Sequence, residues 1–188
     1  MSALFNCCVL FFCLVGGSFA QITQRGTCPT VQPVQNFQPQ NLSGMWYQVR
    51  RYNNFFDLNK RCNRINLSIR SGNRLGIIER AINTVSGDVT ETNLTLTPVN
   101  RGQAQYRVRL SAFSNQISLL TILDTDYTSF AIFYMCQDVA DTRLVYLWLL
   151  SRQSTLGLNT LGRRLRVEAA NNLPIGELRT VDQLNCPA

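Results

Sequence analysis

Gly44-Met-Trp-Tyr-Gln-Val-Arg-Arg-Tyr52 opens the series of strand-like runs that decides the fold. From Gly44 to Ser151, apolar and polar residues mainly alternate, and Gly, Asn, Asp and Ser interrupt the alternation at short intervals. A period of two is typical of a half-buried strand, because successive side chains point to opposite faces. We count eight such runs, which cover approximately residues 44–52, 62–71, 74–83, 89–98, 105–111, 117–124, 130–137 and 144–151.

Short turn signals join several of these runs. Ser71-Gly-Asn, Ser86-Gly-Asp and Asn100-Arg-Gly are typical of hairpin turns. Strands joined in this way form an antiparallel meander, and eight of them without a long crossover close naturally into a barrel. The sequence therefore predicts an all-β fold, an eight-stranded antiparallel up-and-down β-barrel. The interior of such a barrel is wide enough for one small ligand.

The segments on either side of the barrel pattern are different in character. Residues 21–40 are polar with three prolines, which indicates an extended arm. After the last barrel strand, apolar residues recur at three- and four-residue spacing, which predicts one α-helix packed outside the barrel. The residues of that stripe are Leu158, Leu161, Leu165 and Ala169. A short last strand is predicted over about residues 178–184.

The first twenty residues have the features of a secretory signal peptide. Cys7 to Val15 is an apolar run too short to span a bilayer, and Ser18-Phe-Ala20 is similar to a cleavage site. We expect residues 1–20 to be removed before Gln21, and residues 21–188 to form one secreted, extracellular domain. An uncleaved anchor is the alternative.

Four cysteines remain after the signal peptide, namely Cys28, Cys62, Cys136 and Cys186. In a secreted chain, four widely spaced cysteines indicate two disulfides, with three possible connectivities. Secretion also fits the N-glycosylation triplets, which begin at Asn41, Asn66 and Asn93.

The residue types present exclude several classes of enzyme. The chain contains no histidine, which removes Ser-His-Asp and Cys-His nucleophiles and every His-containing zinc site. No metal site and no resident cofactor are predicted. Lys60 is the only lysine, and nucleic acid is not an expected partner for a secreted chain without a stacking motif.

The formal net charge is +7, and the excess is spread along the chain, with clusters around the first two strands and on the predicted helix. Such clusters are most often a solvated surface. The alternative is attraction of anionic lipid headgroups or a ligand carboxylate. The residues concerned are Arg50, Arg51, Lys60, Arg61 and Arg64, and then Arg163, Arg164 and Arg166.

Three motifs coincide in order and spacing with the signature regions of a known family. Gly44-Met-Trp46 opens the first strand, Thr125-Asp126-Tyr127 lies between the sixth and seventh strands, and Arg152 ends the eighth. Together with the single helix, these motifs resemble the lipocalin family over about residues 28–186. The resemblance implies that Trp46 and Arg152 stack to close the base of the barrel by a cation–π contact. Asp126 is then a turn residue rather than an acid catalyst.

The cysteine positions are similar to those of the insect bilin-binding, apolipoprotein D-like and Lazarillo-like lipocalins. That similarity implies the pairs Cys28–Cys136 and Cys62–Cys186. Some lipocalins use a free thiol for catalysis, but here all four cysteines are expected to be paired, so we predict no enzyme.

The side chains that face the interior follow from alternation once one residue per strand is fixed. Arg152 at the base places Leu150, Trp148 and Tyr146 inward, and Cys136 must face outward to reach the arm. The predicted ligand-binding wall comprises Leu94, Leu96, Tyr106, Val108, Leu110, Leu120, Ile122, Ala131, Phe133, Met135, Tyr146, Trp148 and Leu150. Phe55 and Phe56 follow the first strand, where they form a ligand gate, contact a membrane or fold under their loop.

This interior is apolar and aromatic, as small-molecule pockets usually are. The first hypothesis is a secreted carrier or scavenger that binds a fatty acid, retinoid, sterol or bilin pigment non-covalently. A bilin is less favoured, since the chain offers no imidazole. The alternative is an interaction module with a filled barrel, which contacts a protein, a receptor or a membrane surface as a peripheral partner.

Overall fold

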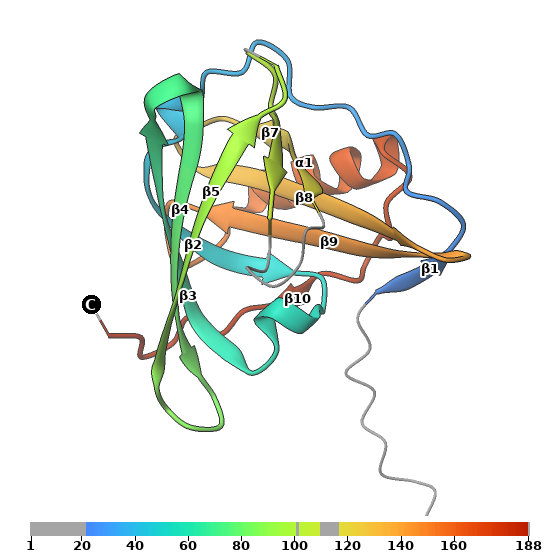
Figure 1. Ribbon diagram of the computed structural model, residues 1–188. Helices are drawn as coiled ribbons and strands as arrows, with labels where there is room; N and C mark the ends of the chain where they lie inside the picture. Colours follow the sequence, from blue (N-terminus) through green and yellow to red (C-terminus); the bar gives the residue numbers. More distant parts are fainter. Residues whose placement is uncertain (1–21, 101, 110–116, 188) are drawn as a thin grey trace, which may run out of the picture.

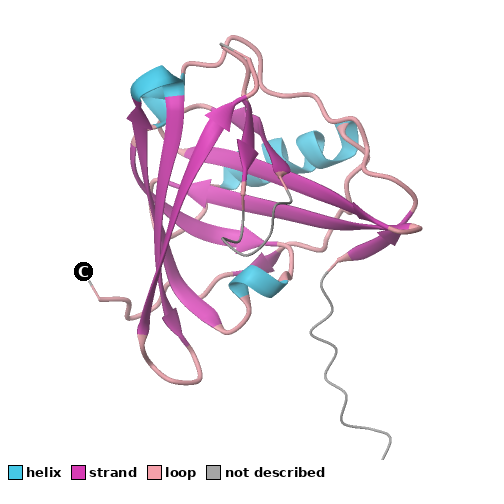
Figure 2. Ribbon diagram, in the orientation of Figure 1, coloured by secondary structure: helices cyan, strands magenta, loops and turns pink. Residues whose placement is uncertain are grey.

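The computed structural model describes residues 22–100, 102–109 and 117–187. The expected signal peptide, residues 1–20, lies outside this range, as does Leu110. One antiparallel sheet dominates the molecule (Figures 1 and 2). Its strands are β1 (Thr23–Arg25), β2 (Gly44–Arg51), β3 (Lys60–Arg70), β4 (Arg74–Asn83), β5 (Val89–Pro98), β6 (Gln105–Val108), β7 (Ser118–Thr125), β8 (Phe130–Val139), β9 (Thr142–Ser151) and β10 (Arg179–Thr180).

Strands β2 to β9 form a closed barrel. Each pairs with its neighbour in the sequence, and β9 also pairs with β2, with Tyr47 opposite Ser151. The short strands β1 and β10 extend the sheet on β9 and β2. Three 3₁₀ turns complete the barrel, at Pro39–Leu42, Phe55–Asp57 and Ser71–Asn73. The predicted eight-stranded up-and-down barrel is confirmed.

Alternation along the strands separates two apolar cores. On β8, Ala131, Phe133 and Met135 point into the barrel, while Ile132 and Tyr134 point outward beneath the helix. The inner core continues over all the other barrel strands. The C-terminal helix lies against one side of the barrel (Figure 2), and residues of the helix and of its flanking segments cover the outer core.

The helix α1 (Leu158–Ala170) forms where it was predicted, but the expected buried face is wrong. Leu158 is 87% exposed and Leu165 39% exposed, whereas Thr160, Arg164 and Glu168 are buried. Arg164 donates to Glu168 one turn later at 3.2 Å, and this ion pair lets the polar stripe face the barrel. The expectation of a solvated basic cluster on the helix is therefore wrong for Arg164.

Both ends of the described chain are fastened to the barrel wall by disulfides. Cys28 is bonded to Cys136 on β8, and Cys62 on β3 is bonded to Cys186, as the resemblance implies. The last strand is shorter than predicted, because the segment after β10 leaves the sheet ladder. Its Gln183 side-chain amide instead donates to the backbone carbonyls of Gln48 and Asn63 and bridges β2 and β3.

Candidate functional site

A cavity of about 260 Å³ lies inside the barrel. Its wall is predominantly apolar and draws on all eight barrel strands as well as on the loop between β2 and β3. The residues that line it are Gln48, Phe56, Asp57, Lys60, Ile65, Ile77, Glu79, Thr92, Leu94, Val108, Leu120, Phe133, Met135 and Trp148.

Half of the residues predicted to bind the ligand line this cavity, and the other half do not. The predicted residues that line it are Phe56, Leu94, Val108, Leu120, Phe133, Met135 and Trp148. Those that point into the barrel without lining the cavity are Leu96, Tyr106, Ile122, Ala131, Tyr146 and Leu150, all at most 2% exposed. Alternation gives the face of a strand but not the depth along it. The barrel is thus packed solid in one part and hollow in another.

The base of the barrel is closed by the first and third signature motifs. The guanidinium of Arg152 stacks on the Trp46 ring, and the Trp46 indole donates to the Leu42 carbonyl at 2.8 Å. Gly44 has a φ of +102°, and a Cβ there would lie 3.2 Å from the Arg152 guanidinium. A glycine therefore suits both the backbone and the close approach.

The second signature motif is a turn, as predicted for Asp126. The Asp126 carboxylate accepts hydrogen bonds from the backbone of Thr128, Ser129 and Phe130 and from the Ser129 hydroxyl. Burial raises the pKa of Asp126, but these hydrogen bonds outweigh it and leave the pKa below its ordinary value. Thr125 caps the same turn by donating to the Phe130 carbonyl, and the Tyr127 carbonyl accepts from Arg152.

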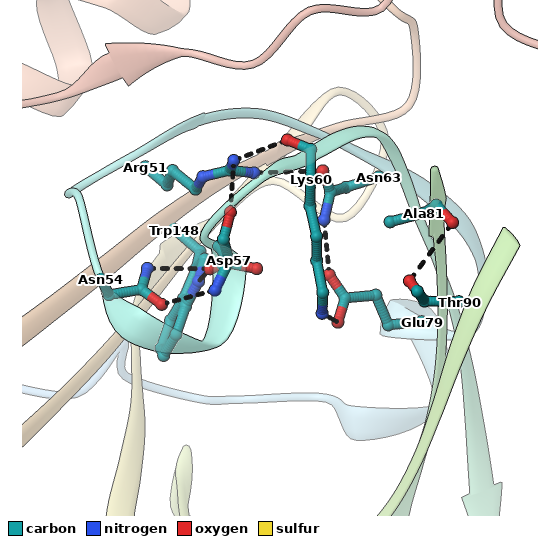
Figure 3. A network of polar contacts seen from close by, with 9 residues as sticks. All are labelled: Arg51, Asn54, Asp57, Lys60, Asn63, Glu79, Ala81, Thr90 and Trp148. Atoms are coloured by element: carbon teal, nitrogen blue, oxygen red, sulfur yellow. Dashed lines mark hydrogen bonds and ion pairs between the residues drawn. The ribbon is translucent and has the colours of Figure 1, made fainter. Parts of the chain in front are cut away.

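Asp57 is the main cavity residue that the sequence analysis missed. It ends the 3₁₀ turn Phe55–Asp57, in which the Asn54 side chain caps the Asp57 amide. The Asp57 carboxylate accepts from the Trp148 indole at 2.7 Å and from the Asn54 amide at 2.8 Å (Figure 3). The turn thereby fixes Phe56 at the cavity, while Phe55 is 74% exposed.

A second polar group stands beside Asp57. Lys60 and Glu79 form an ion pair at 3.3 Å, and Asn63 donates to the other oxygen of Glu79 at 2.7 Å (Figure 3). Burial, reinforced by the charge of Asp57, raises the pKa of Glu79 against the opposing effects of Lys60 and Asn63. Alternation from Ile77 could have placed Glu79 on the inner face.

Arg51 connects Asp57 to the Lys60–Glu79 ion pair and its partner Asn63. Its guanidinium donates to the Asn63 side chain and to the carbonyls of Asp57 and Lys60. Burial lowers the pKa of Arg51 despite the neighbouring carboxylates. Arg51 and Lys60 are thus parts of a connected network, and the expectation that they belong to a solvated basic surface is wrong.

Three aromatic rings line up beside the network. Phe56 lies 5.7 Å from the Tyr146 ring, and Tyr146 stacks on Trp148 at 5.8 Å and 16°. The Tyr146 hydroxyl donates to the Gln137 side chain at 3.3 Å. The glycosylation candidates Asn41, Asn66 and Asn93 are all exposed on the outside.

Within residues 22–100, 102–109 and 117–187, no cluster of cysteine and carboxylate side chains could hold a metal ion. Over the same part of the chain, no helix has the length and apolar character needed to cross a membrane.

A closed eight-stranded barrel with a capped base and an apolar inner cavity is the architecture of the lipocalins, a family that binds small hydrophobic molecules. The chain belongs to the lipocalin / cytosolic fatty-acid binding protein family, whose model matches residues 43–164.

Relatives of known identity agree with this family. Apolipoprotein D of Macaca fascicularis is 26% identical over 176 residues, which cover 93% of this chain and 92% of the relative. The bilin-binding protein of Pieris brassicae is 24% identical over 153 residues, which cover 79% of each chain. The solved structure of apocrustacyanin C1 superposes with a TM-score of 0.75 at 22% identity, over 88% of this chain and 93% of that one. This last likeness supports the fold alone.

Proposed function

We propose that the protein is a secreted carrier or scavenger that holds a small lipophile non-covalently inside its barrel. The observation that carries the proposal is the inner cavity, where Val108, Leu120, Phe133 and Met135 present apolar surface away from solvent. Burial of an apolar ligand against such a wall contributes roughly 25 cal/mol for each Å² removed from water.

Secretion rests on two lines of support. The first twenty residues have the composition of a signal peptide. The two disulfides, with sequence separations of 108 and 124 residues, belong to an oxidising compartment. The exposed positions of the three glycosylation triplets are compatible with it.

The experiment is a titration of the secreted protein with N-phenyl-1-naphthylamine, an uncharged probe that fluoresces in apolar surroundings. Leu94→Trp fills the cavity, and Leu119→Trp is the matched control because Leu119 is 42% exposed and does not line it. We expect the probe to bind the wild type and Leu119→Trp and to lose most of its affinity in Leu94→Trp. Equal binding by all three proteins would place the probe outside the barrel. Native mass spectrometry of the secreted protein identifies any lipophile that co-purifies.

One observation favours a second function, contact with a membrane surface through the loop that follows β2. Phe55 is 74% exposed and Leu58 is 42% exposed on this loop. Exposed apolar side chains on one loop are typical of an interaction site. Sedimentation with lipid vesicles tests it, with Phe55→Ser expected to reduce the bound fraction while probe binding inside the barrel is unchanged.

A further inference from the structure

The side-chain amide of Gln48 is unusual for its position. Gln48 lies on β2, is 1% exposed and lines the cavity. Its amide nitrogen is buried and donates to no acceptor among the residues that the structure describes. A buried donor without a partner carries a free-energy cost, so native proteins rarely retain one.

Gln48 differs in this from the other buried polar atoms that lack a partner. Those atoms belong to Tyr134 in the outer core and to Arg164 and Glu168 on α1, none of which lines the cavity. The backbone carbonyl of Gln48 is already satisfied by Gln183. The side-chain nitrogen is without a partner, and Gln48 belongs to the wall of the space where a ligand would lie.

The charges around the same cavity set the second condition. Its ionisable side chains are two carboxyl groups, Asp57 and Glu79, and one ammonium group, Lys60. Lys60 is already paired with Glu79 at 3.3 Å. A ligand carboxylate would therefore compete with Glu79 for the single cation and would be repelled by Asp57.

We infer that the cavity selects an uncharged lipophile with one oxygen acceptor, an alcohol or a carbonyl compound, whose oxygen accepts a hydrogen bond from the Gln48 amide. This inference rests on the proposed function, since it assigns the ligand class of the same cavity. The acceptor satisfies Gln48, and the rest of the molecule packs on the apolar wall. Carboxylates of the same carbon skeleton bind more weakly.

Retinol and retinoate test the inference, because they share a skeleton and differ in the terminal group. Each displaces N-phenyl-1-naphthylamine from the wild type, from Gln48→Leu and from Glu79→Gln. We expect the wild type to bind retinol about tenfold more tightly than retinoate. Gln48→Leu should weaken retinol by about five- to tenfold relative to the probe, the effect of losing one net hydrogen bond, with the affinity of the probe measured directly for each variant.

Glu79→Gln removes one of the two negative charges, and we expect it to strengthen retinoate several-fold with little effect on retinol. Gln48→Met serves in place of Gln48→Leu if the latter fails to give a cooperative thermal transition. Equal affinity of wild type for retinol and retinoate, together with no effect of either Gln48 variant, would overturn the inference while probe binding still supports the carrier. Failure of the probe itself to bind would instead remove the proposed function.

Discussion

The guanidinium carbon of Arg152 lies 3.7 Å from the centre of the Trp46 ring, and the same guanidinium donates to four backbone carbonyls. Those carbonyls belong to Asn41, Ser43, Met45 and Tyr127, so one side chain joins the turn before β2, the start of β2 and the turn after β7. Burial lowers the pKa of Arg152. The stack is therefore the joint that closes the barrel base.

Of the substitutions at the barrel base, replacement of Trp46 is expected to destabilise the fold most. Trp46 is fully buried, and Trp46→Ala should lower the free energy of unfolding by about 3–5 kcal/mol. Arg152→Ala should cost less, and Arg152→Lys should recover only part, since an ammonium group lacks the planar stacking surface. Thermal and urea unfolding measure all three. A melting temperature unchanged by Trp46→Ala would contradict the closure.

Asp126 should stabilise the second signature turn in a pH-dependent way. Its folded pKa lies below the ordinary value of 3.8. Its contribution is therefore complete above that ordinary value and is lost as the pH falls through the folded pKa. We expect Asp126→Asn to lower stability at neutral pH and to flatten the acid side of the stability curve. Unfolding at several pH values checks this, and parallel curves for the two proteins would refute it.

Glu168 has the opposite pH dependence. Burial raises its pKa, with Arg164 opposing the shift. Its carboxyl therefore stabilises the fold most below the ordinary value of 4.5, and this contribution falls as the pH rises towards the folded pKa. Glu168→Gln should therefore abolish the part of the stability loss at rising pH that is due to ionisation of Glu168. At neutral pH, Glu168→Ala should cost about 3–5 kcal/mol, because it leaves Arg164 buried and unpaired, whereas the double apolar variant Arg164→Met, Glu168→Leu should be nearly neutral.

The two disulfides of the structure should be the pairing found among Cys28, Cys62, Cys136 and Cys186 in the protein. Non-reducing peptide mapping is expected to recover Cys28 with Cys136 and Cys62 with Cys186. Removing either pair by serine substitution should cost roughly 4–5 kcal/mol, since each bond closes a loop of over a hundred residues. A peptide that joined Cys28 to Cys62 would contradict the structure.

Trp148 should report ligand binding, because it lines the cavity while Trp46 lies at the base. Trp148→Phe is expected to abolish most of the ligand-induced fluorescence change, and Trp46→Phe very little of it. Trp148→Phe also removes the donor to Asp57, so its ligand affinity is measured independently by probe displacement. A signal that followed Trp46 instead would locate the ligand at the closed end.

Much of the barrel could be predicted from the sequence, because alternation and short turns are local signals. The faces of β8 and β9 were correct once Cys136 and Arg152 had been assigned a side. The depth of each residue could not be predicted in this way, which is why Ala131 and Leu150 were placed with the ligand although they fill the packed part of the barrel.

The errors elsewhere have a common cause, which is pairing between polar side chains. Arg164 is buried because Glu168 accompanies it, and hydropathy alone reads both as surface residues. Gln48 and Glu79 lie on strands whose apolar neighbours Trp46 and Ile77 face inward, so alternation would have placed both in the cavity wall. The partners of Glu79 are Lys60 and Asn63 on the neighbouring strand β3, and no local pattern around Glu79 identifies them.

The closed base removes one end of the barrel as a route to the cavity. With Trp46, Leu42 and Arg152 closing that end, any ligand of the cavity would have to enter and leave elsewhere than through the base. A variant that raises only the barrier to passage should slow entry and release by the same factor and leave the Kd unchanged.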